Sequence, residues 1–96
     1  MNELIRTLTQ AWGPTSYEGN IRTIITNELK SLKLESRVDT LGNLIYHLPS
    51  SGRKKLLLSA HMDQIGINVT YVDKKGFLRF GAVGGLNPYQ VLGHRF

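Results

Sequence analysis

The most informative absence in this sequence is that of cysteine, which does not occur among its 96 residues. A chain without cysteine cannot form a disulfide framework or a thiolate metal site, so packing alone must hold a small fold together. Disulfides are typical of secreted proteins, and their exclusion agrees with an intracellular protein. We therefore expect a cytoplasmic location.

Long hydrophobic runs are also lacking. A membrane-spanning helix needs about 18 consecutive apolar residues, whereas the longest strongly apolar stretch here is Leu56 to Leu58. The first residues, Met1 to Arg6, do not show the basic region followed by an apolar block that marks a secretory signal. The sequence therefore predicts neither a membrane partner nor a secretory leader.

Acidic residues are scarce, because 7 Asp and Glu stand against 12 Lys and Arg, for a net charge of +5. After residue 39 the carboxylates are those of Asp63 and Asp73. A nucleic-acid-binding protein gathers its positive charge in one patch, but the basic residues here are spread along the chain and several fall in predicted turns. We expect no nucleic-acid partner, since the alternative would need contributions from Lys54, Lys55, Lys74 and Lys75. The positive excess also fits a chain from which an acidic remainder is missing.

Hydrophobic spacing predicts two helices at the start of the chain. Leu4, Ile5, Leu8 and Trp12 recur at helical intervals over residues 3–12, and Gly13-Pro14 ends that helix. Thr15 and Glu18 then form the T-x-x-E pattern of a capping box, which predicts that a second helix begins there. Its apolar stripe runs to about residue 33 and contains Tyr17, Ile21, Ile24, Ile25, Leu29 and Leu32.

Alternating and apolar runs predict strands after residue 34. Residues 36–40 alternate like an edge strand, residues 44–48 form the next, and residues 55–60 have an apolar centre typical of a strand buried on both faces. Residues 65–72 and 77–80 flank an Asp-Lys-Lys-Gly turn and predict a hairpin, and residues 92–96 resemble the opening of another strand. Two helices packed on a β-sheet indicate the α/β class.

The tripeptide His61-Met62-Asp63 directly follows the predicted strand at 55–60. Ligands and metals gather beyond the carboxyl ends of strands in open α/β sheets, and residues two apart in extended chain point to the same side. We therefore expect His61 and Asp63 to share a face, where the imidazole could bind a metal and the carboxylate could fix its tautomer. An H-x-D pattern alone occurs often by chance, and a structural or surface histidine is the simpler interpretation.

Longer segments add a resemblance to that pattern. Residues 57–66, Leu-Leu-Ser-Ala-His-Met-Asp-Gln-Ile-Gly, are similar to the first metal-ligand strand of the glutamyl/leucyl aminopeptidases, a family that includes the tetrahedral aminopeptidases. Residues 13–18 resemble that family's early Gly-Pro-Ser-Gly-Tyr-Glu segment, and residues 39–44 resemble its D-x-x-G-N-L turn. Similar segments at 69–80, 83–85 and 91–95 follow in the family's order, so the resemblance covers essentially the whole chain.

The resemblance implies a dinuclear metallo-aminopeptidase that acts on peptides with a free amino terminus. In this family two divalent ions, zinc or cobalt, share a bridging water, and a glutamate acts as general base. His61 matches the histidine that binds one ion, and Asp63 matches the aspartate, counted as a catalytic residue, that orients it. The implied fold is the amino-terminal part of a phosphorylase/hydrolase-like α/β catalytic domain over residues 1–64. Residues 65–96 would begin an inserted β-barrel domain used for subunit contacts, and members commonly assemble as dodecamers.

The sequence departs from the family in ways that limit what it can do alone. Ser16 replaces a glycine and Gln64 stands where glutamate is frequent, while the family's other metal ligands and its Glu-Glu pair lie later than residue 96. His47, His94 and Asp73 are the remaining candidate ligands, and no glutamate follows Glu35. A two-metal centre needs carboxylates that bridge the ions, so we predict that the chain alone does not hydrolyse peptides.

The alternative hypothesis is a non-catalytic relic, or an assembly module built from the same fold fragment. Family members are often labelled endoglucanase or cellulase. A glycosidase needs two carboxylates that flank a sugar bond, and none of the matched segments supplies such a pair.

Overall fold

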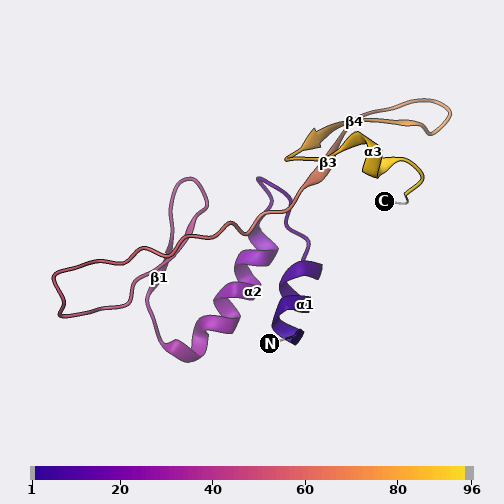
Figure 1. Ribbon diagram of the computed structural model, residues 1–96. Helices are drawn as coiled ribbons and strands as arrows, with labels where there is room; N and C mark the ends of the chain where they lie inside the picture. The colour runs from indigo at the N-terminus through magenta and orange to yellow at the C-terminus, as the bar shows by residue number, and fades with distance from the viewer. Residues whose placement is uncertain (1, 95–96) are drawn as a thin grey trace.

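The protein is elongated. A computed structural model describes residues 2–94, with principal extents of 62 × 31 × 22 Å and a radius of gyration of 17.9 Å. A compact chain of this length would have a radius of gyration of about 12–13 Å. The two amino-terminal helices and the first strand pair form one end, and a β-hairpin with a short carboxyl-terminal helix forms the other (Figure 1). The elements in chain order are α1 Asn2–Gln10, α2 Gly19–Leu29, the 3-10 turn η1 Lys30–Leu32, β1 Ser36–Val38, β2 Leu44–Tyr46, β3 Gly66–Val72, β4 Leu78–Val83 and α3 Pro88–Val91.

The two predicted helices are present and lie side by side (Figure 1). Ile21 of α2 is 4% exposed and is the one buried hydrophobic side chain within residues 2–94. The predicted stripe is otherwise half-buried over α2, as at Ile24 and Ile25. After α2 the chain tightens into η1 and ends with Lys33 in the left-handed conformation, φ 51°. The two predicted helices are therefore confirmed, but the core that they build within the described residues is small.

The predicted capping box is wrong, because α2 begins at Gly19 and not at Thr15. Residues 14–17 instead form a tight turn, in which the Tyr17 amide donates to the Pro14 carbonyl at 2.8 Å. Glu18 does reach back, but its Oε1 accepts from the Ser16 amide at 2.6 Å. The Thr15 hydroxyl is bonded to Asp63, 48 residues away. A T-x-x-E pattern predicts a cap only when no other partner competes for the threonine, and here one does.

Ser16 sits in this turn with φ 74°, a left-handed conformation that favours glycine. We expect Ser16→Gly to stabilise the chain by about 1 kcal/mol, since the backbone strain is removed and the hydrogen bond to Glu18 comes from the backbone. The measurement is the urea midpoint followed by circular dichroism. The matched control is Ser36→Gly on β1, where glycine should instead lower stability, by about 0.5–1 kcal/mol. A Ser16→Gly chain less stable than the parent would contradict this account.

The next elements are the antiparallel strands β1 and β2, joined by a turn that Asp39 organises. Asp39 Oδ1 accepts from the amides of Leu41 and Asn43 at 3.0 and 2.9 Å, and Oδ2 accepts from the Asn43 side chain at 2.8 Å. The Asn43 side chain is the largest cause of a lowered pKa of Asp39. Gly42 has φ 88°. The Asp-x-x-Gly-Asn spacing thus encodes the turn directly, although both strands are shorter than expected.

The strand predicted at residues 55–60 is not buried. The segment is extended but forms no strand pairing in the described structure, and Leu56, Leu57 and Leu58 are each 86% exposed. The prediction of burial on both faces is therefore wrong for this chain. The physical reason is that a strand becomes buried only when neighbouring strands and helices cover it, and no strand within residues 2–94 pairs with this one.

The predicted hairpin is confirmed as β3 and β4, with the turn at residues 73–76. Asp73 Oδ1 accepts from the amides of Lys75 and Phe77 at 2.8 and 2.9 Å, which explains the aspartate at the start of the turn. The register shifts between Val69 and Tyr71, so Thr70 is an extra residue that bends β3. Strand β4 extends further than predicted, to Val83.

The chain after β4 differs from the prediction. Asn87 caps the short helix α3, its side chain accepting from the Tyr89 amide. Residues 92–94 form a turn and not the opening of a strand, and the rest of that predicted strand, residues 95–96, lies outside the described residues. Within the described part, none of the helices is long and apolar enough to cross a membrane.

Candidate functional site

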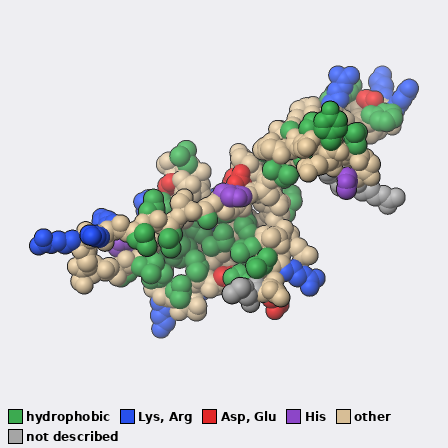
Figure 2. Space-filling view, viewed as in Figure 1, with side chains coloured by type: hydrophobic (Ala, Val, Ile, Leu, Met, Phe, Trp, Pro, Cys, Tyr) green, Lys and Arg blue, Asp and Glu red, His purple; other side chains and the backbone are tan. Residues whose placement is uncertain are grey.

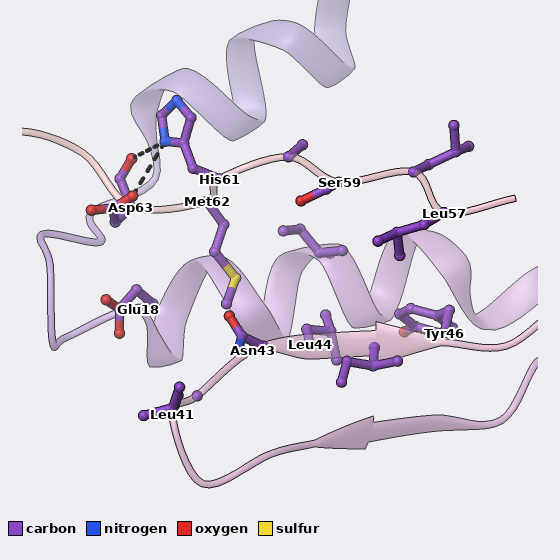
Figure 3. A pocket seen from close by; sticks show the side chains of 15 residues that line it. Glu18, Leu41, Asn43, Leu44, Tyr46, Leu57, Ser59, His61, Met62 and Asp63 are labelled. Atoms are coloured by element: carbon purple, nitrogen blue, oxygen red, sulfur yellow. Dashed lines mark hydrogen bonds and ion pairs between the residues drawn. The ribbon is translucent and has the colours of Figure 1, made fainter.

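His61 and Asp63 lie at the end of the extended segment that includes residues 55–60, close to the start of α2 (Figure 3). Their side chains share one side of the chain, as the two-residue alternation predicts, while Met62 points the other way (Figure 3). His61 Nδ1 lies 3.2 Å from Asp63 Oδ1 and 3.0 Å from the Asp63 carbonyl oxygen. The imidazole is thus held through one of its two nitrogens.

The two partners of His61 Nδ1 determine the tautomer. A carbonyl oxygen and a carboxylate oxygen can only accept hydrogen bonds, so Nδ1 must carry the proton in the neutral ring. The lone pair of Nε2 is then free to bind a metal. The His61 side chain is 86% exposed, so that lone pair is accessible.

The Asp63 carboxylate is held from its other side by Thr15. The Thr15 hydroxyl donates to Asp63 Oδ2 at 2.7 Å, whereas Oδ1 is the oxygen that faces His61. The hydrogen bond from Thr15 is the largest cause of a lowered pKa of Asp63, and the bond with His61 acts in the same direction. Both effects favour the ionised carboxylate that this arrangement needs.

A groove of about 640 Å³ lies beside the pair. One wall is formed by residues 41–46 of the Asp39 turn and β2, and the other by residues 57–63 (Figure 3). Ile25 of α2 lines it as well. The groove therefore runs from the exposed leucines to the His61–Asp63 pair.

The other candidate ligands lie elsewhere. The Asp73 carboxylate accepts hydrogen bonds from amides of its own turn. His47 is exposed directly after β2, and His94 is exposed near the carboxyl end. Among residues 2–94, no group of three or more His, Asp or Glu side chains could hold a metal ion. The residues present therefore fit one ligand, His61, with its orienting carboxylate, and the described part holds no complete centre.

Thr15 is the site residue that sequence reasoning missed. The T-x-x-E pattern assigned it to a helix cap, and nothing in the spacing of two residues 48 positions apart links them. The local signal that could have suggested another role is Gly13-Pro14 directly before it. Such a pair breaks regular structure and makes a turn at Thr15 as reasonable as a helix start.

Comparison with solved structures supports the α/β fold. PhTET1-12s, solved with a dodecamer in the asymmetric unit, matches with a TM-score of 0.81 and 40% identity over 91% of this chain and 26% of that one. The TET aminopeptidase from the marine sediment archaeon Thaumarchaeota archaeon SCGC AB-539-E09 also matches with a TM-score of 0.81, at 31% identity over 88% of this chain and 23% of that one. The expected α/β class is thereby confirmed.

Sequence comparison points to the same family. A protein of Acetivibrio thermocellus is 47% identical over 95 residues, which are 99% of this chain and 28% of that protein. The lysyl aminopeptidase of Pyrococcus furiosus is 35% identical over 97% of this chain and 27% of its own length. The chain thus spans about a quarter of the length of the curated relatives that it matches. The model of the M42 glutamyl aminopeptidase family matches residues 42–96, and the chain therefore belongs to the M42 aminopeptidase family.

Proposed function

We propose that this chain contributes one metal ligand and its orienting carboxylate to the active site of a metal-dependent aminopeptidase. The substrates would be peptides with a free amino terminus, from which one residue is released at a time. The observation that carries the proposal is the hydrogen-bonded pair of His61 and Asp63, which leaves His61 Nε2 free and accessible. Family membership supplies the reaction class, since relatives carry the names lysyl and glutamyl aminopeptidase.

Two divalent ions, zinc or cobalt, would polarise the scissile carbonyl and lower the pKa of the attacking water when bound. The task of this chain's residues is narrower. His61 would bind one ion through Nε2, and Asp63 would hold the ring so that this nitrogen faces the metal. The further ligands and the general base are expected from the part of the enzyme that this chain does not span, because the curated relatives are about four times as long.

The domain organisation and the partners form part of the same proposal. Residues 1–64 would belong to the catalytic α/β domain, and residues 65–96 would begin the inserted β-barrel domain. The exposed apolar side chains of the hairpin, among them Tyr71, Phe77 and Phe80, support a role of that region in subunit contacts. A dodecameric neighbour supports a homo-oligomer. We place the enzyme in the cytoplasm and expect no nucleic-acid partner.

A chimeric enzyme tests the proposal. This chain would replace the 94 matching residues of the Pyrococcus furiosus lysyl aminopeptidase, and release of the first residue from a peptide would be measured with zinc or cobalt present. We expect an active chimera. His61→Ala should then lower kcat/KM by about 100-fold or more, because it removes a metal ligand.

The controls separate this result from a general loss of folding. His47→Ala in the same chimera should leave the rate within about twofold, since His47 lies outside the site and surface changes rarely matter. The 96-residue chain alone should release no amino acid. A folded, metal-loaded chimera that is fully active with His61→Ala would refute the proposed role of His61. The remaining alternative, an assembly module without catalytic role, would then be favoured by the exposed hairpin.

A further inference from the structure

The hydrogen bond between Thr15 and Asp63 joins two segments that are far apart in the sequence. It is 2.7 Å long, and it links the turn before α2 to the residue that faces His61. A surface threonine usually bonds to a nearby backbone group or to water, as Thr9 and Thr23 do with the helix carbonyls of Ile5 and Gly19. Thr15 is different because it bonds to a carboxylate that is itself engaged with a histidine.

The residues just before Thr15 also contact the residues that follow Asp63. The Gln64 amide donates to the Gly13 carbonyl at 3.0 Å, and Pro14 and Gln64 form a parallel bridge. Further along, a methyl group built on Gly66 would lie 3.3 Å from Pro14 Cβ. The two segments are therefore in direct contact without the help of the Thr15 side chain.

The turn also fixes Thr15 itself. The turn is closed by the hydrogen bond from the Tyr17 amide to the Pro14 carbonyl. The amide of the residue after Thr15, Ser16, donates to Glu18 Oε1 at 2.6 Å. The Thr15 side chain is β-branched and has few accessible rotamers. The hydroxyl is thus presented to Asp63 by a backbone that is braced independently.

The consequence for the carboxylate is geometric. An aspartate carboxylate rotates easily about its terminal bond, and either oxygen could face the imidazole. Because Thr15 holds Oδ2, the plane of the carboxylate is set and Oδ1 is directed at His61 Nδ1, 3.2 Å away. Nδ1 faces this oxygen and the Asp63 carbonyl oxygen, 3.0 Å away, so the hydroxyl acts on one of the two contacts that fix the tautomer of a ring that it does not touch.

We propose that Thr15 is a positioning residue, whose hydroxyl orients the Asp63 carboxylate so that His61 keeps its proton on Nδ1 and presents Nε2 to a metal. The catalytic meaning of this arrangement rests on the proposed function, but the arrangement itself is a property of the metal-free chain. It is therefore testable without metal or peptide.

The test is to measure the His61 tautomer in the 96-residue chain by long-range ¹H–¹⁵N NMR, under alkaline conditions in which the ring is neutral. We expect Thr15→Val to lower the ratio of Nδ1–H to Nε2–H tautomer at His61 by about threefold, the loss of one modest hydrogen bond. Thr15→Ser keeps the hydroxyl and should restore the parent ratio. Thr9→Val removes a hydroxyl that bonds to a carbonyl of its own helix and not to Asp63, and it should leave the ratio unchanged.

A second signal in NMR spectra of the same samples distinguishes a residue that orients the carboxylate from one that only holds the two segments together. The Gln64 amide reports whether the turn remains docked, because it donates to Gly13. An altered tautomer with an unchanged Gln64 amide supports the proposal. An unchanged tautomer in Thr15→Val would overturn it, and so would a Thr15→Ser chain that behaves like Thr15→Val. Loss of the Gln64 bond together with the tautomer change would also overturn it, since Thr15 would then be a structural tether.

These outcomes are independent of the chimeric enzyme. If the chimera proves insensitive to His61→Ala while Thr15→Val shifts the tautomer, the proposed function fails and the positioning role stands. If His61→Ala abolishes activity while Thr15→Val leaves the tautomer ratio unchanged, the proposed function stands and the positioning role of Thr15 fails.

Discussion

Gly13→Ala is expected to destabilise the helical part of the chain by about 1–3 kcal/mol, the cost of forcing an extra methyl group into a packed site. Gly13 is buried, and a Cβ placed on it would lie 2.9 Å from Ile21 Cγ2 and 3.3 Å from Ile21 Cβ. Isoleucine is stiff about its first side-chain bond, so it cannot easily move aside. The measurement is urea unfolding followed by the fluorescence of Trp12, the single tryptophan, which neighbours the substituted position.

The matched control for that experiment is Gly19→Ala. Gly19 begins α2, and a Cβ there would meet nothing within 4 Å. Because alanine is the better helix former, this change should leave stability unchanged or raise it by up to about 1 kcal/mol. We therefore expect a loss of stability for Gly13→Ala and no loss for Gly19→Ala. Equal effects, or a Gly13→Ala chain as stable as the parent, would show that Ile21 does not pack as described.

Leu57→Lys is expected to suppress self-association of the chain. Leu56, Leu57 and Leu58 are each 86% exposed in an extended segment without strand partners in the described structure. Exposed apolar strands with free backbone edges recruit other chains. A lysine in the middle should lower the association constant about tenfold or more, which corresponds to ~1.4 kcal/mol. Sedimentation velocity over a range of concentrations provides the measurement.

Leu41→Lys is the control for this effect. Leu41 is as exposed, at 87%, but it lies alone in the Asp39 turn and not in an extended apolar run. If the run of leucines drives association, Leu41→Lys should leave the association constant within about twofold of the parent. Equal suppression by both substitutions would indicate that added charge is responsible, and no association of the parent at high concentration would contradict the interpretation outright.

Local patterns in the sequence were sufficient for the elements that depend on neighbouring residues. The stripe through Ile21 and Ile25 predicted α2, and the Asp39 and Asp73 turns follow from side chains that bond to amides two and four residues on. The shared side of His61 and Asp63 follows from the alternation of extended chain. In each case the partners are within a few positions, so the pattern contains the interaction.

The sequence patterns did not predict which apolar side chains stay exposed. Figure 2 shows hydrophobic side chains exposed over the helical end, and Lys and Arg at both far ends of the viewed face. The run Leu56 to Leu58 predicted burial because apolarity reports what a segment is suited for, and not which residues cover it. The capping box at Thr15 failed for a related reason. The partner of Thr15 is Asp63, and a contact across 48 positions leaves no periodic trace in a sequence.

The 48 positions between Thr15 and Asp63 also affect the order in which parts of the chain are expected to fold. Closing a loop costs entropy that grows with the logarithm of its length, and the Thr15–Asp63 bond spans 48 residues while the Asp73–Phe77 bond of the hairpin turn spans 4. The difference amounts to about 2 kcal/mol. Hairpins form within about 1–10 μs, so β3 and β4 can pair early and independently. We therefore expect the His61 environment to be completed late, after α2 and the β1–β2 turn have shortened the path between Thr15 and Asp63.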